Sequence, residues 1–238
     1  MFLQESDLEE LREFFADRLV RPVKYVVFSQ DRPSIHDPLP IQHELCTDAV
    51  TLLGEILPLS EKLSLNVLDV NDDPLSSLRY DVEKVPAIAI LGQEDHGLRF
   101  YGVPSNFEFI TFLEITANVS AGQTDLCDST LRALEEIRQP VHIQVFYTPS
   151  CALCPLMTHL AMQFAIASPW IRCDTIDAAE FPQLAENHNV RGAPHIVLNG
   201  NQSIVGVKQE KVLLKIIRQA ASMPCPVVKA CSNGSAVK

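Results

Sequence analysis

Short apolar runs alternate with amphipathic stretches along most of the chain. Runs rich in β-branched and aromatic residues predict strands at residues 24–29, 65–70, 85–91, 98–102, 142–147, 170–176, 193–198 and 203–207. Apolar residues three and four positions apart predict helices at residues 6–19, 41–57, 72–80, 106–117, 126–138, 151–164, 179–188 and 208–221. Ser6 and Glu9 are expected to form a capping box at the start of the first helix. The pattern as a whole predicts an α/β fold.

The two halves of the chain carry the same order of predicted elements, β-α-β-α-β-β-α behind a leading helix. A shift of 108 residues superimposes identical residues without a gap: Asp69 on Asp177, Pro74 on Pro182, Val82 on Val190, Pro86 on Pro194, Ile88 on Ile196 and Gly92 on Gly200. Shared hydrophobicity does not account for identities at polar, proline and glycine positions. We therefore predict an internal duplication, with one fold over residues 1–120, a second over residues 121–222 and a flexible tail over residues 223–238.

One motif stands out for its chemistry. Cys151-Ala152-Leu153-Cys154 follows a predicted strand and opens a predicted helix. Unsatisfied N–H groups and the positive end of the helix dipole lower the pKa of a cysteine there and make its thiolate nucleophilic. The second cysteine lies on the same side of the helix and can attack a mixed disulfide formed by the first.

A zinc or iron–sulfur half-site is the alternative interpretation of this motif. Such sites usually need a second cysteine or histidine pair at similar spacing, and no other Cys-x-x-Cys occurs in the chain. We therefore predict dithiol–disulfide exchange, with no metal and no other cofactor.

The first half carries a degenerate copy of the motif. The same shift places His43-Glu44-Leu45-Cys46 opposite Cys151-Ala152-Leu153-Cys154, with His43 at the position of the first cysteine. One thiol cannot act as a dithiol, so the first copy is expected to be inert. The remaining cysteines before the tail, Cys46, Cys127 and Cys173, are expected to be buried core residues. Whether Cys225 and Cys231 of the tail exchange with Cys151 stays open.

Composition and charge narrow the function classes. A chain of 238 residues with 47% hydrophobic residues can bury full cores. No apolar run reaches the length of a membrane span and the acidic start does not resemble a signal peptide, so we expect a cytoplasmic protein without a membrane partner. A net charge of −11 argues against nucleic acid as a partner.

Residues 1–120 hold 21 acidic and 9 basic residues, which indicates a well-solvated acidic half or, as the alternative, a docking surface.

Several features together resemble the thioredoxin superfamily. They are the tandem arrangement, Cys-x-x-Cys-Pro between strand and helix, and Ala193-Pro194-His195-Ile196 about forty residues later. More closely, the chain resembles protein disulfide oxidoreductases built from two thioredoxin-like folds. It is also similar to the amino-terminal domain of the F subunit of alkyl hydroperoxide reductase, in which the first fold has lost its cysteine pair. The resemblance implies two three-layer α/β/α folds, each with a mixed central sheet flanked by helices.

The resemblance also implies a mechanism and partners. Cys151 would attack a substrate disulfide and Cys154 would resolve the mixed disulfide. Pro194 would be cis and face the cysteines, and the backbone at Ala193 would pair with an extended substrate. Protein thiols and disulfides are the implied substrates, with a flavin-dependent thioredoxin reductase and a peroxiredoxin as implied partners. The Gly-Gly turn typical of glutathione-dependent glutaredoxins is absent from this sequence.

Gln144 and His195 are candidate modulators of the cysteine pair, and Gln144 departs from the family pattern. Relatives often place a carboxylate beside the buried cysteine to accept its proton, whereas the strand here offers Gln144, which cannot accept one. His159 and Asp177 are possible substitutes, although a surface histidine and a strand-end aspartate are the simpler interpretations. A cationic His195 would stabilise the Cys151 thiolate, but alternation along the strand favours a side chain that points away.

The alternative function is a docking or chaperone-like module. In that interpretation the acidic first half holds a partner and redox turnover is secondary. The direction of electron flow cannot be read from the apolar dipeptide Ala152-Leu153.

Overall fold

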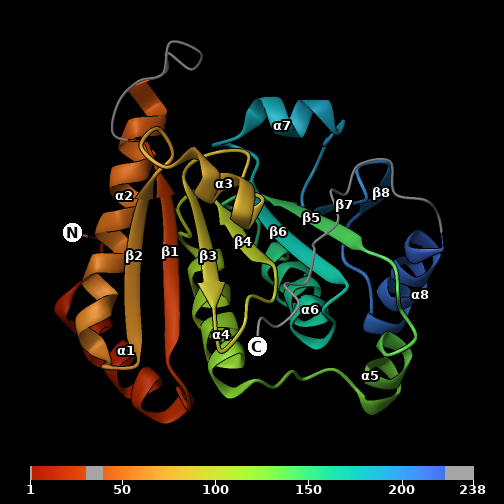
Figure 1. The fold of residues 1–238 in the computed structure, drawn as a ribbon, viewed down its shortest axis with the longest axis horizontal. Coiled ribbons are helices and arrows are strands. Elements are labelled where there is room, and N and C mark those ends of the chain that lie inside the picture. The colour runs from red at the N-terminus through yellow and green to blue at the C-terminus, as the bar shows by residue number, and fades with distance from the viewer. Residues whose placement is uncertain (1, 31–39, 223–238) are drawn as a thin grey trace, which may run out of the picture.

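The computed structural model of the chain describes residues 2–30 and 40–222 (Figure 1). The helices are α1 (Glu5–Arg18), α2 (Pro40–Ile56), α3 (Pro74–Tyr80), α4 (Phe107–Ala121), α5 (Asp128–Leu134), α6 (Cys154–Ala167), α7 (Pro182–Asn187) and α8 (Glu210–Ala221), with a 3-10 turn η1 (Leu57–Leu59). The strands are β1 (Val23–Ser29), β2 (Leu63–Asp69), β3 (Ala87–Leu91), β4 (Leu98–Tyr101), β5 (Val141–Tyr147), β6 (Ile171–Asp177), β7 (His195–Leu198) and β8 (Gln202–Val205). Each helix and strand that the hydrophobic pattern predicts is present.

The strands form one continuous mixed sheet in the order β2-β1-β3-β4-β6-β5-β7-β8. The first half of the chain (β1–β4) and the second half (β5–β8) repeat the same internal order, which agrees with the predicted duplication. Parallel pairing of β4 with β6, from Leu98 opposite Cys173 to Tyr101 opposite Ile176, joins the halves. The ends of β4, β5 and β6 therefore meet at one edge of the seam.

Helices cover both faces of this sheet, so the fold has a layer of helices on each side of a central sheet. The larger apolar core lies under α1, α2, α4, α5, α6 and α8, and α4 and α6 are visible behind the sheet in Figure 1. The second core lies under α3 and α7 and includes Phe28, Phe146, Ile176 and Ala185. Side chains alternate between the two cores along each strand.

Two local expectations about helix ends are wrong. The chain begins α1 earlier than predicted, because Gln4 rather than Ser6 is the N-cap and its N–H donates to Oδ2 of Asp7 at 2.8 Å. Gln4 and Asp7 thus replace Ser6 and Glu9 in the capping box. The linking helix, α5, is shorter than predicted because its end tightens into three-residue turns, where the N–H of Ile137 donates to the backbone oxygen of Leu134.

The predicted domain limits stay a prediction. Helix α4 runs to Ala121, so the boundary after residue 120 falls in its last turn. The predicted tail at 223–238, with Cys225 and Cys231, lies outside the described residues. Among the residues that are described, no helix is long and apolar enough to cross a membrane.

A partly buried ion network joins the two halves at the seam. Arg172 on β6 donates through Nε to Oδ1 of Asp174 at 2.8 Å and through Nη2 to the backbone oxygen of Asp81 at 2.6 Å. Nε2 of His142 lies 2.7 Å from Oδ2 of Asp174. Although burial opposes it, the charges of Arg172 and His142 hold the pKa of Asp174 well below its usual range. Asp81 belongs to the first half, so this network spans both halves.

Candidate active site

A disulfide joins Cys151 and Cys154, whose Cα atoms are 5.4 Å apart. The structure therefore holds the motif in its oxidised form. Helix α6 begins at Cys154, so the expectation that both cysteines lie in the first helical turn is wrong for Cys151. Cys151 lies in the preceding turn, where its N–H donates to the Thr148 oxygen at 2.9 Å. Cys154 is fully buried and Cys151 is half-exposed.

A cleft of about 650 Å³ opens beside Cys151. Its walls come from the motif, from the end of β6, from α7 and from the segment before β7, and include Thr148, Cys151, Leu153, Ala178, Glu186, Arg191 and Ala193. Leu153 is 58% exposed at this cleft. The cleft gives an extended chain access to the half-exposed sulfur.

Ala193 lines this cleft. The Ala193–Pro194 peptide bond is cis, as the resemblance implies. The carbonyl of Pro194 accepts a hydrogen bond from Gly206 at 2.8 Å. Within the described part of the chain, neither the N–H nor the carbonyl of Ala193 has a hydrogen-bond partner. An incoming strand can use these groups. Pro86, the counterpart in the first half, is also cis.

His195 and Gln144 lie on the α7 side of the sheet. The ring of His195 is buried 6.5 Å from the ring of Phe146, which also lies 5.6 Å from the ring of His188. Neither ring nitrogen of His195 has a partner among the described residues, and burial, with His188 nearby, lowers the pKa of His195. Gln144 is buried two residues before Phe146, on the same face of β5. Neither His195 nor Gln144 is among the residues that line the cleft.

Glu108 on α4 is a site residue that the sequence interpretation missed. It is 1% exposed, and its Oε1 accepts a hydrogen bond of 3.2 Å from the Thr158 hydroxyl. Thr158 follows Cys154 by four residues on α6, so both point to the same side of the helix. Burial raises the pKa of Glu108 to about 7, and the charge of Asp177 adds to the rise. A lone glutamate inside the apolar run Phe107-Glu108-Phe109-Ile110 was the available signal.

Two further carboxyl groups, those of Asp177 and Glu180, also have a raised pKa. Asp177, at the end of β6, is fully buried, and its Oδ2 has no partner among the described residues. Burial raises the pKa of Asp177, and burial together with Asp177 raises the pKa of Glu180 to about 7. Burial, and after it the charges of Asp177, Glu108 and Glu180, raises the pKa of Tyr147 well above the usual value. Tyr147 ends β5, the strand that leads to Cys151.

The other candidate residues fall elsewhere. Cys46 and Cys173 are buried as expected, whereas Cys127 is exposed at the N-cap of α5, which contradicts the expectation for it. His159 accepts or donates hydrogen bonds with Asn118 and Gln163 rather than with a cysteine. Within the described ranges, no group of three or more His, Cys, Asp or Glu side chains could hold a metal ion.

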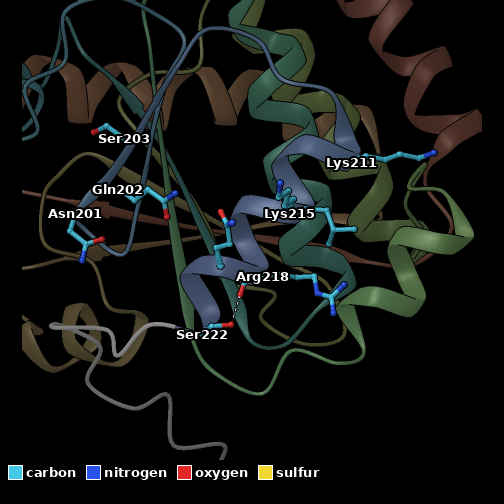
Figure 2. A pocket seen from close by; sticks show the side chains of 9 residues that line it. Asn201, Gln202, Ser203, Lys211, Lys215, Arg218 and Ser222 are labelled. Carbon is cyan, nitrogen blue, oxygen red and sulfur yellow. Dashed lines mark hydrogen bonds between the residues drawn. The ribbon is translucent and has the colours of Figure 1, made fainter.

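A larger cavity lies away from the disulfide, between β8 and α8 (Figure 2). It measures about 1180 Å³, and Asn201, Gln202, Lys215 and Ser222 are among its lining residues. It shares no residue with the cleft at Cys151. None of its lining residues is a cysteine, so it offers no thiol chemistry.

Comparisons with known proteins agree with this geometry. Residues 141–218 match the family model of the thioredoxin domain. A protein disulfide oxidoreductase from Aeropyrum pernix k1 superimposes with a TM-score of 0.82 and 30% identity over 93% of this chain and 95% of that chain. The F subunit of alkylhydroperoxide reductase from Enterococcus faecalis (V583) has the same fold, with a TM-score of 0.81 and 22% identity over 91% of this chain and 100% of that chain.

Curated relatives are longer proteins. The chain is 30% identical over 131 residues to the F subunit of alkyl hydroperoxide reductase from Pseudomonas aeruginosa and spans 25% of its length. It is 24% identical over 170 residues to an NADH dehydrogenase of Bacillus subtilis (strain 168) and spans 31% of that protein. The chain thus corresponds to about a third or less of these relatives.

Proposed function

The chain belongs to the protein disulfide oxidoreductases with a thioredoxin domain, and on that premise we propose that it exchanges disulfides with protein substrates through Cys151 and Cys154. The observation that carries the proposal is the disulfide itself. One sulfur belongs to a half-exposed residue at a cleft, and the other to a buried residue one helical turn before Thr158, the hydrogen-bond partner of Glu108. Such an asymmetric pair separates an attacking thiol from a resolving thiol.

Reduction of a substrate proceeds in two displacements. The thiolate of Cys151 attacks one sulfur of the substrate disulfide, and the other substrate sulfur leaves and takes up a proton. The Cys154 thiol then loses its proton and attacks Cys151. The Cys151–Cys154 bond forms, the bond from Cys151 to the substrate breaks, and two electrons have passed to the substrate. Oxidation of a substrate dithiol is the reverse sequence.

Glu108 is the proposed acceptor of the Cys154 proton. The hydrogen bond from Thr158 orients Glu108 one helical turn from Cys154. A carboxyl group whose pKa is raised to about 7 is matched to proton transfer near neutral pH. Glu108 would supply the carboxylate that Gln144 does not.

Substrate chains are proposed to bind along the segment before β7. The free N–H and carbonyl of Ala193 suit backbone pairing with an extended segment that carries the reacting cysteine. Pro194 would hold that edge toward the motif. Exposed Leu153 would contact apolar residues beside the substrate cysteine.

The physiological role we propose is a relay of electrons from a flavin-type reductase to a peroxidase of the peroxiredoxin class. Likeness to the F subunit of alkyl hydroperoxide reductase supports this role. A cytoplasmic location would fit it, because buried thiols such as Cys46 and Cys173 stay reduced there.

Reduction of insulin disulfides by dithiothreitol tests the proposal. Wild-type protein should accelerate precipitation of the insulin B chain, Cys151→Ser should be inactive, and the control Cys127→Ser should match wild type. Equal background rates for wild type and Cys151→Ser would rule out the oxidoreductase activity. Cys154→Ser should trap partners as mixed disulfides with Cys151, and capture of a flavoprotein and a peroxidase from the source cell would support the relay.

A further inference from the structure

Two helices from different halves of the chain begin at the same edge of the sheet. Strands β4, β5 and β6 run parallel to one another. Helix α4 follows β4, and α6 follows β5 by way of the cysteine motif. The first turns of α4 and α6 therefore lie at the edge that carries Cys151. At this end the helices are in contact, because Glu108 in the first turn of α4 accepts the hydrogen bond of 3.2 Å from Thr158 on α6.

The sides of α4 and α6 that face each other carry apolar residues at this end. Phe107 lies three helical turns before Asn118 on the same side of α4, and Oδ1 of Asn118 lies 3.2 Å from Nε2 of His159 on α6. Leu156 lies three residues before His159, on the same side of α6. Phe107 and Leu156 therefore flank the line along which the two helices meet, at the end that carries the cysteines.

Four large apolar side chains are exposed along this line. Phe107 is 46% exposed, and Ile110, one turn later on α4, is 61% exposed. Leu156 is 57% exposed, and Leu153, one turn before it, lines the cleft beside Cys151. Exposed apolar residues that gather in one place mark contact surfaces for other molecules. We call Phe107, Ile110, Leu153 and Leu156 the apolar rim.

The backbone that leads into Phe107 is strained. Asn106, the N-cap of α4, has a φ of +51° and a ψ of −124°, a region that glycine adopts readily and other residues do not. Its side chain makes no capping hydrogen bond that would offset the strain. Residues held in such conformations gather at functional sites, which supports a role for this turn beyond starting a helix.

A mixed disulfide determines what would cover the apolar rim. A substrate bonded to the sulfur of Cys151 has to enter the cleft that Leu153 lines. A standard protein–protein interface buries about 800 Å² on each partner, so a protein substrate covers more than the cleft around its reacting cysteine. The apolar rim continues the cleft through Leu153, which places it under such a substrate.

We propose that the apolar rim is the docking surface for the protein substrate, and that Phe107 and Ile110 give the half without a dithiol a part in substrate recognition. The partner it fits is a folded protein whose redox-active cysteine is bordered by apolar side chains. This inference rests on the proposed function, because a substrate covers the rim only when it is bonded to Cys151.

Two disulfides of different size test the proposal. The parent is reduced protein carrying Cys127→Ser, Cys225→Ser and Cys231→Ser. Insulin is the protein substrate: its reduction in the presence of dithiothreitol is followed by chromatographic separation of the chains, which yields kcat and KM. The small disulfide is 5,5′-dithiobis(2-nitrobenzoate), mixed rapidly with the protein. Cys151 attacks it and releases the first thionitrobenzoate in a concentration-dependent phase, and Cys154 then displaces the second from Cys151 in a unimolecular phase.

Phe107→Ser combined with Ile110→Ser removes the first half's share of the apolar rim. We expect KM for insulin to rise about tenfold with kcat unchanged, because docking contacts are the same before and during the reaction. Both thionitrobenzoate phases should match the parent, since the small disulfide reaches Cys151 without covering the rim. Phe107→Leu combined with Ile110→Leu keeps the apolar surface and should hold KM within about twofold of the parent.

Another exposed apolar pair supplies the matched control. Leu75 and Leu78 are three residues apart on α3 and are more exposed than Phe107 and Ile110. They belong to the other face of the sheet, away from α4 and α6. Leu75→Ser combined with Leu78→Ser should therefore leave KM for insulin unchanged.

The failure of this inference and that of the proposed function are distinguishable. An unchanged KM in the Phe107→Ser, Ile110→Ser variant overturns the inference, as does an equal rise in the α3 control; the proposed function stands in both cases. Insulin reduction by Cys151→Ser at the rate of the parent overturns the proposed function instead. Should the double serine variant not fold, Ile110→Ser alone decides, with an expected rise in KM of about threefold.

Discussion

The hydroxyl of Thr158 donates a hydrogen bond of 3.2 Å to Oε1 of Glu108, and this contact joins α6 to α4 one helical turn behind Cys154. Glu108 belongs to the half of the chain without a cysteine pair, and Thr158 to the half with one. The carboxyl group proposed to serve the resolving cysteine therefore comes from the other half. On this proposal, the chemistry of the cysteine pair depends on how the two halves meet.

Glu108→Gln should slow the resolving step without affecting the first attack. Loss of the proton acceptor is expected to lower the unimolecular rate by about tenfold or more at pH 7, because the Cys154 thiol must then lose its proton to water. Stopped-flow release of thionitrobenzoate measures both phases. Glu114→Gln on the same helix, whose side chain pairs with Arg18 instead, is the matched control and should leave both phases unchanged. Equal slowing by both variants would indicate damage to α4 rather than a lost base.

Thr158→Val should shift the pH dependence of the same step upward. The hydroxyl stabilises the ionised form of Glu108, so its loss raises the pKa of Glu108 further and moves the acid limb up by about half a pH unit. Thr158→Ser keeps the hydroxyl and should restore the wild-type profile. A valine variant with an unaltered profile would show that the hydrogen bond does not tune the acceptor.

Hydrophobic spacing was sufficient to locate the strands and helices, because each half buries the same faces of the same elements. The constant offset that pairs Pro86 with Pro194 likewise indicates the duplication from the order of residues alone. Helix ends were less predictable: Gln4 and Asp7 form a capping pair as good as Ser6 and Glu9, and the sequence does not rank them. The start of α6 at Cys154 similarly follows from the turn made by Thr148 and Cys151.

The sequence predicts only part of the site, because local spacing reveals residues within one half and not contacts between the halves. Cys151, Cys154 and Pro194 are identified by local spacing within one half. Glu108 lies far from Cys154 in the sequence, and its contact with Thr158 forms where the two halves meet, at the packing of α4 on α6 and the pairing of β4 with β6. Spacing along one strand or helix carries no information on that pairing. Cys127 is exposed because it is the N-cap of α5. Its residue type alone predicts burial instead.

Asp174→Asn should destabilise the fold and remove one contribution to the pH dependence of the free energy of unfolding. A buried partner of Arg172 and His142 is lost, so we expect the free energy of unfolding at pH 7 to fall by about 3 kcal/mol. The folded pKa of Asp174 lies below its unfolded value of about 3.9, so its stabilisation is present above that value and is lost as pH falls through the folded pKa. The difference between wild type and variant should therefore shrink below about pH 4. Urea unfolding measures it, with Asp72→Asn as an exposed control; a constant difference at all pH values would contradict the assignment.

His195→Phe should make the protein less sensitive to mild acid. Burial lowers the pKa of His195 in the folded state, so the stability that depends on its neutral form is lost as pH falls below the unfolded value of about 6.5. The melting temperature of wild type should therefore drop more between pH 7 and pH 5 than that of the variant. The exposed His43→Gln serves as control.

The same variant tests whether His195 modulates the disulfide. A cationic imidazole near Cys151 would make the disulfide more oxidising, and about 30 mV corresponds to a tenfold change in the equilibrium. A neutral ring packed against Phe146 exerts no such effect, so we expect the redox potential at pH 7 to change by less than about 10 mV. Titration against dithiothreitol measures it. A fall of roughly 30 mV or more would show that His195 acts on the cysteine pair despite its place under α7.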